Sequence, residues 1–134
     1  MPRALRLVLQ EERLAICRLP PDGSLPDWFP GRGPIASMTL TEEELSLVVN
    51  DADLPAGVSA QRGWRAFKVL GPLDFALTGV LATLSGALAQ AGISLFALST
   101  FDTDYILVRE GDVPAARRAL RSAGDSAWPI ELLE

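Results

Sequence analysis

The sequence predicts an α+β fold in which helices cover one face of antiparallel sheets. A chain of 134 residues with 49% hydrophobic content can form one compact unit, or two small units that share a core. Apolar stretches of strand length occur along the whole chain, whereas helical spacing of apolar residues occurs only after residue 70. The first half is therefore expected to consist of strands, and the second half to mix strands with helices.

The N-terminal half is expected to hold four strands. The first two are predicted over 4–9 and 13–19, where leucine and isoleucine alternate with other residues. A second pair is predicted over 35–40 and 45–49. Between the pairs, residues 20–34 include five prolines and three glycines, a composition that prevents regular structure. We expect this segment to be a loop.

The C-terminal half is expected to follow the order β-α-β-β-α-β. The first helix is predicted to end near Ala91 with Gly92 as its stop, and the second to be capped by Asp112 with Pro114 in its first turn. Strands are predicted over 64–70, 93–99, 105–109 and 128–133. This order is typical of the split βαβ arrangement, in which helices cover one face of a four-stranded antiparallel sheet.

One face of the first helix is expected to be buried, because its apolar residues recur three or four positions apart. These residues are Leu77, Val80, Leu81, Leu84, Leu88 and Ala91.

Composition excludes several function classes. A net charge of -5 disfavours nucleic acid and anionic membranes as partners. Cys17 is the single cysteine, so no intrachain disulfide can form. No apolar run is long enough for a signal segment or a membrane span, and we expect a cytoplasmic protein. Histidine is absent, which removes the usual general base of hydrolases and the commonest zinc ligand. We therefore expect no enzyme, no metal and no cofactor.

Thr78, Gly79 and Val80 form the first candidate segment of a site for a free amino acid. Such a ligand needs donors for its carboxylate and acceptors for its ammonium group. If a helix begins at this segment, its unpaired N–H groups and its dipole would hold a carboxylate, and Gly79 would let the ligand approach the backbone. Alternatively, the helix starts at Asp74 and Gly79 is a packing residue inside it.

The second candidate segment runs from Ser99 to Asp104 and is predicted to join two strands by a turn. Its carboxylates, Asp102 and Asp104, can meet an ammonium or a guanidinium group. The residues alone more often indicate an ordinary hairpin with Asx-type turn bonds. A Mg²⁺ site at these two aspartates is a further alternative, although the sequence places no third acidic group nearby.

The stretch TGVLATLSGALAQAGISLFALSTFDTDYILVREGDV, residues 78–113, resembles the regulatory ACT-domain segment of aspartate kinases. It resembles more closely the CASTOR family of arginine sensors and their small bacterial relatives. The likeness lies in a glycine that opens a helix, an AGIS turn into a strand, and an STxxTD hairpin. It covers about residues 63–113 and extends more loosely to LTEEELSLVV in the first half.

This resemblance implies two ACT-like units with the ferredoxin-like βαββαβ order, the first of them poor in helix. Residues 1–60 would form the degenerate N-terminal unit and residues 61–134 the ACT domain. In the family, an amino acid binds between two ACT units that lie side by side. Carried over residue by residue, this implies ligand contacts at Gly79, Ser99, Thr100, Phe101, Thr103 and Asp104, and the flanking Thr78 and Val80 complete the predicted set.

The predicted function is that of a non-catalytic regulator that senses an amino acid or a similar small molecule. The arginine sensors contain more ACT units than this chain can, so a homodimer would be needed to restore the number, and a protein partner would read the ligand state. Two alternatives remain: an interaction module whose ligand site is vestigial, and an enzyme that acts through Asp102 and Asp104 alone.

Overall fold

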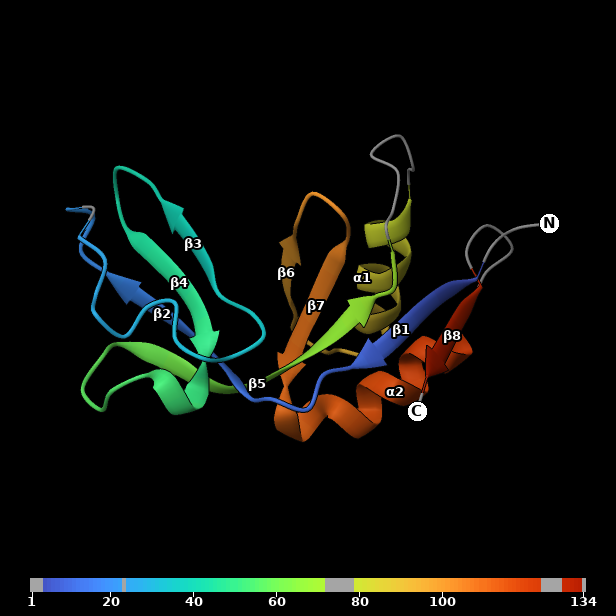
Figure 1. The fold of residues 1–134 in the computed structure, drawn as a ribbon. Coiled ribbons are helices and arrows are strands. Elements are labelled where there is room, and N and C mark those ends of the chain that lie inside the picture. The colour runs from blue at the N-terminus through green and yellow to red at the C-terminus, as the bar shows by residue number, and fades with distance from the viewer. Residues whose placement is uncertain (1–3, 23, 72–78, 124–128, 134) are drawn as a thin grey trace. The chain divides into compact units, whose positions relative to one another are not determined.

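The computed structural model describes residues 4–22, 24–71, 79–123 and 129–133, and it confirms the α+β class (Figure 1). The strands are β1 (Leu5–Leu9), β2 (Leu14–Leu19), β3 (Ser37–Leu40), β4 (Leu45–Asn50), β5 (Ala60–Val69), β6 (Phe96–Ser99), β7 (Asp104–Arg109) and β8 (Ile130–Leu133). The helices are α1 (Val80–Gln90) and α2 (Val113–Ser122), with short 3₁₀ turns η1 (Asp51–Asp53) and η2 (Glu110–Asp112). No helix in the described ranges is long and apolar enough to cross a membrane.

The chain divides into two compact units. Unit 1 comprises Met1–Gln10 with Arg65–Glu134, and unit 2 comprises Glu11–Trp64. Strand β5 contributes its first part to unit 2 and its second part to unit 1. β1 therefore groups with the C-terminal elements rather than with its neighbours in sequence. The two ACT-like domains expected over 1–60 and 61–134 stay a prediction.

Unit 1 contains the order β5-α1-β6-β7-α2-β8 that the sequence predicts, with β1 added to its sheet. The strands lie in the order β6-β7-β5-β1-β8. β1 is antiparallel to β5 but parallel to β8, with Leu5 opposite Ile130. The expectation of purely antiparallel sheets is therefore wrong for this pair. The pairing joins the two ends of the chain, and no local sequence pattern reports such a contact.

Helices α1 and α2 pack on one face of the unit 1 sheet, as expected. Alternate residues of the strands point toward them, for example Leu5 and Leu7 of β1 and Phe67 and Val69 of β5. The helices contribute Val80, Leu84, Ala87, Leu88, Val113, Ala116 and Leu120 to the same core. Leu81, expected on the buried face, is 37% exposed. It lies one residue, about 100° around the helix, from Val80, which begins the buried stripe. Leu77 lies outside the described residues.

The predicted stop of α1 at Gly92 is confirmed, but the following strand is shorter than predicted. Gly92 has φ +74°, and the Ile93 N–H donates to the Leu88 carbonyl at 3.0 Å. This hydrogen bond caps the helix C-terminus, and the buried Ile93 side chain joins the core. The apolar character of Ile93 is therefore explained by its burial in the core beside the helix C-terminus. Strand β6 begins only at Phe96.

Unit 2 is a four-stranded antiparallel sheet in the order β3-β4-β2-β5. The described residues of unit 2, 11–22 and 24–64, contain the 3₁₀ turn η1 and no α-helix, as the sequence predicts for the first half. One sheet face buries Cys17 and Leu47 in a cluster with Leu54, which follows η1. The aromatic side chains of Trp28 and Phe29 from the proline-rich loop pack against this cluster. Loop aromatics thus take the covering role that helices have in unit 1.

Candidate functional site

The first candidate segment lies at the start of α1. Gly79 is the N-cap of this helix and has a left-handed backbone with φ +82°, and Val80 is the first helical residue. A left-handed residue cannot continue a right-handed helix, so the alternative in which Gly79 packs inside this helix is wrong. Val80 points into the core, with 6% of its surface exposed. The predicted ligand contact of Val80 is therefore assigned to its backbone N–H. Thr78 lies outside the described residues.

The start of α1 has the chemistry of an anion site. The first N–H groups of a helix have no partner within it, and the helix dipole is positive at this end. The first turn of α1 holds no acidic residue that would compete for this charge. Gly79 has no side chain to block the approach of a ligand to the backbone. These features suit a carboxylate.

The second candidate segment is the loop of the β6–β7 hairpin, and its polar side chains pair with one another. Ser99 lies opposite Asp104 in the register, and its hydroxyl donates to Asp104 Oδ1 at 2.6 Å. The Thr100 N–H donates to the Thr103 carbonyl at 2.8 Å, and Thr100 Oγ1 accepts from the Thr103 N–H at 3.2 Å. Thr100 therefore makes the turn bonds, in place of the Asx-type bonds that are expected of an ordinary hairpin.

Thr103 fastens the hairpin to the end of β5. It is 7% exposed, and its hydroxyl donates to the Val69 carbonyl at 2.6 Å. The family resemblance implies a ligand contact at Thr103, but no local pattern predicts this bond, because Val69 lies 34 positions earlier. The buried hydroxyl has a clear structural role, since an unpaired carbonyl at this point would lower the stability.

The two candidate segments lie at the same end of unit 1. The loop between β6 and β7 and the start of α1 are both at the upper side of unit 1 in Figure 1. Ser99, Thr100 and Phe101 are exposed, Phe101 to 80%, and Asp104 is half-buried. The predicted ligand contacts of these residues stay predictions, and the arrangement gives them donors on the helix and acceptors on the hairpin.

Two observations concern the alternatives of a metal site and of a reactive cysteine. No group of three or more His, Cys, Asp or Glu side chains there has a geometry that holds a metal ion, so Asp102 and Asp104 gain no third acidic partner. Burial raises the pKa of the Cys17 thiol, against a smaller lowering by a backbone hydrogen bond at Leu47. A buried, protonated thiol is a poor nucleophile.

Comparison with known proteins identifies the class. A sequence model of the ACT domain matches residues 59–122. This chain belongs to the ACT-domain family, in agreement with the resemblance read from the sequence. Among curated relatives, the Bos taurus cytosolic arginine sensor for mTORC1 subunit 1 is 32% identical over 106 residues, which are 72% of this chain and 32% of the sensor. Human CASTOR3P is 30% identical over 110 residues, 72% of this chain and 68% of that protein.

The chain thus spans about a third of the length of the arginine sensor. Solved structures agree on the fold. Protein Atu0741 from Agrobacterium tumefaciens is 32% identical with a TM-score of 0.85, over 98% of this chain and 96% of that chain. The regulatory subunit of aspartate kinase from Thermus flavus is 14% identical with a TM-score of 0.63, over 92% of this chain and 100% of that chain. At that identity the second likeness concerns the fold alone. The sensor and the kinase subunit are named for regulatory roles.

Proposed function

We propose that this chain is a non-catalytic regulator that binds an amino acid or a similar small molecule where two ACT units meet. The observation that carries the proposal is the glycine-initiated helix α1 at the same end of unit 1 as the Ser99–Asp104 loop. Relatives that are named arginine sensors support the ligand class.

In the proposed complex, the ligand carboxylate binds the backbone N–H groups at the start of α1. The ligand ammonium donates to the Asp104 carboxylate and to the Ser99 hydroxyl oxygen, whose own proton is already given to Asp104. Both charges of the ligand are then matched without a cofactor or a metal.

We further propose that the protein acts as a cytoplasmic homodimer. A second copy would bring the number of ACT units closer to that of the arginine sensor, of whose length this chain spans about a third. The relatives that support the ligand class are named cytosolic. A ligand that binds one subunit arrangement better than another would shift the population toward it, and a partner protein would read that shift.

A thermal-shift screen of the standard amino acids tests the proposal. A ligand present at 100 times its dissociation constant adds about 2.7 kcal/mol to the free energy of unfolding, which raises the midpoint clearly. Light scattering with and without the ligand reports the subunit number. If no amino acid gives a saturable shift, the proposal fails.

A matched pair of variants locates the site. Asp104→Ala should weaken binding at least tenfold, because it removes a charge-assisted partner of the ammonium group worth about 1.5–3 kcal/mol. Asp102→Ala is the control, since Asp102 is exposed in the same loop and outside the predicted set. Equal effects of the two variants would indicate a general charge effect.

An interaction module with a vestigial site is the second candidate. One observation favours it: the hydroxyl group of Ser99 already donates a hydrogen bond to Asp104, and that of Thr103 donates one to the Val69 carbonyl. This alternative predicts a dimer that no amino acid stabilises, and an Asp104→Ala variant that assembles normally.

A further inference from the structure

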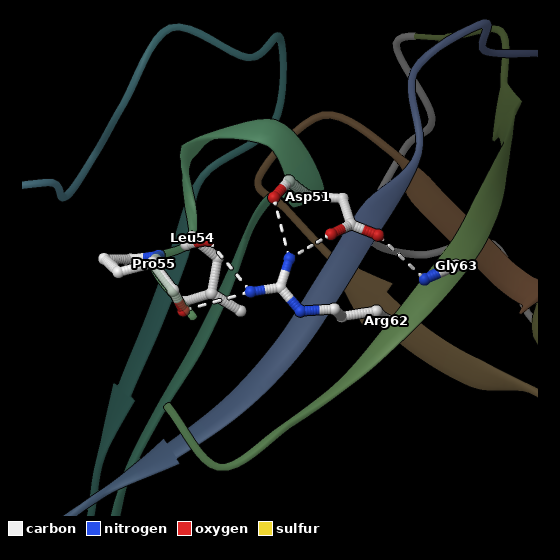
Figure 2. A network of polar contacts seen from close by, with 5 residues as sticks. All are labelled: Asp51, Leu54, Pro55, Arg62 and Gly63. Carbon is white, nitrogen blue, oxygen red and sulfur yellow. Dashed lines mark hydrogen bonds and ion pairs between the residues drawn. The ribbon is translucent and has the colours of Figure 1, made fainter. Parts of the chain in front are cut away.

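Three residues of the segment 51–55 in unit 2, namely Asp51, Leu54 and Pro55, hold the guanidinium group of Arg62 (Figure 2). Arg62 Nη1 donates to the Asp51 carbonyl at 3.1 Å and also to Asp51 Oδ1. Nη2 donates to the carbonyls of Leu54 and Pro55 at 2.8 and 3.0 Å. Both terminal nitrogens thus have two acceptors each, all from one short segment. A carboxylate with three carbonyls matches the charge and the planar fork of a guanidinium group.

The same carboxylate also holds the backbone beside Arg62. Asp51 Oδ2 accepts the Gly63 N–H at 3.0 Å. β2 residue Leu14 pairs with Trp64 and Ile16 with Gln61, so Arg62 and Gly63 together lie opposite Ala15 in a β-bulge. Gly63 has φ +78°, the conformation that a glycine adopts in such a bulge. Asp51 is therefore fixed from the backbone side, independently of the guanidinium group.

Solvent can reach this arrangement. The side chain of Arg62 is 40% exposed and that of Asp51 is 20% exposed. Three of the four acceptors belong to the main chain and the fourth, Asp51, is held by Gly63. Asp51 thus has partners other than Arg62, since its N–H donates to the Arg13 carbonyl and its carbonyl accepts the Leu54 N–H. We therefore expect the segment to keep its shape when the Arg62 side chain is removed.

We propose that residues 51–55 form a binding site for a guanidinium group, and that Arg62 is its built-in occupant. Because Arg62 is tethered, its effective concentration is in the millimolar range or above, and a guanidinium compound from solution competes poorly in the native protein. A guanidinium-bearing ligand enters once the Arg62 side chain is absent or displaced. This proposal does not rest on the amino-acid site of unit 1.

Chemical rescue tests the proposal. Arg62→Ala removes the atoms of ethylguanidinium, so this cation fits the vacated space. We expect the variant to melt at a lower temperature, and millimolar ethylguanidinium to restore at least half of the loss in a saturable way. Ethylammonium should not raise the melting temperature of the variant, because its single point charge cannot make the paired hydrogen bonds of a planar guanidinium group. Neither cation should change the melting temperature of the native protein. Equal responses to the two cations, or no response of the variant, would overturn the proposal.

The Gly63 amide provides a local readout. Its hydrogen exchange should accelerate in Arg62→Ala and slow again with ethylguanidinium, because the cation orders Asp51. A double variant, Asp51→Ala with Arg62→Ala, should lose the rescue. Rescue that persists in the double variant would place the cation elsewhere and contradict the proposal.

A measurement on the native chain covers the case in which Arg62→Ala does not fold. Rotation about the Cζ–Nη bonds of Arg62 should be slow in NMR spectra, because all four acceptors hold the group. Arg118, an exposed residue of α2, is the internal reference for fast rotation. Equally fast rotation in the two residues would show that the site does not hold a guanidinium group.

Discussion

The two units cover their sheets by different means. In unit 1, two helices bury aliphatic side chains such as Leu84 and Leu120 against the strands. In unit 2, a proline-rich loop lays Trp28 and Phe29 on the sheet, and Arg62 joins η1 to β5 through polar bonds. Helices satisfy their own backbone groups, whereas loops must find partners elsewhere. Polar side chains hold loops in both units: Thr103 bonds the β6–β7 hairpin to β5 in unit 1, and Arg62 bonds η1 to β5 in unit 2.

The largest expected effects come from the apolar cores that both units need. Leu84→Ala in unit 1 and Leu47→Ala in unit 2 should each lower the free energy of unfolding by about 2–5 kcal/mol, since both side chains are fully buried. Urea denaturation measures the loss. Leu81→Ala is the control in α1, and its partly exposed side chain should cost less than about 1 kcal/mol. A small loss at Leu47 alone would show that polar bonds carry the stability of unit 2.

Thr103→Val should have the next largest effect. The variant keeps the shape of the side chain but leaves the Val69 carbonyl without its donor, at a cost of about 1–3 kcal/mol. Thr39→Val on the exposed strand β3 is the matched control and should be nearly neutral. Equal stabilities of the two variants in urea would mean that the hairpin of unit 1 does not depend on this bond.

Alanine substitutions at two glycines of the α1 segment should change the stability of the protein in opposite directions. Gly79→Ala forces an L side chain into a left-handed conformation at about 1–2 kcal/mol and should also weaken amino-acid binding. Gly86→Ala should stabilise the protein by about 0.5–1 kcal/mol, because a helix interior favours alanine and the added methyl group meets open space. Thermal unfolding measures both, and a stabilising Gly79→Ala would refute the proposed helix start.

The smallest effect concerns Cys17 in the core of unit 2. Because its pKa is raised in the folded state, its contribution to stability is fully present below the pKa of the unfolded thiol and is lost as pH rises toward the folded value. Cys17→Ser should remove this alkaline decline. A thiol reagent should modify the native protein slowly at alkaline pH and rapidly in denaturant. Fast modification of the folded chain would contradict the burial of Cys17.

Local patterns predicted most of the elements. Alternation located β1 and β2, and the spacing of Val80, Leu84 and Leu88 located the buried face of α1. The strand predicted over 45–49 corresponds to β4. The start of β5 was missed by four residues, because Gln61, Arg62 and Gly63 have the composition of a loop. They form a strand with a bulge through bonds to Asp51, which lies about ten positions earlier in the chain.

The candidate site was predictable only in part, for the same physical reason. Glycine at a helix start and a serine–aspartate pair across a hairpin are short-range features, and both appear in the structure. The Thr103–Val69 bond and the parallel pairing of β1 with β8 join distant segments. Only the fold determines such contacts. The outward position of Phe101 likewise depends on how the hairpin packs.

The most direct test of the proposed function is an NMR titration of the isotope-labelled protein with the amino acids that raise its melting temperature. The account predicts saturable shifts of the amide signals of Gly79, Val80 and the Ser99–Asp104 loop, with unit 2 signals near Asp51 unchanged. If no amino acid shifts these signals, or if the shifts gather at residues 51–55, the proposed amino-acid site of unit 1 is contradicted.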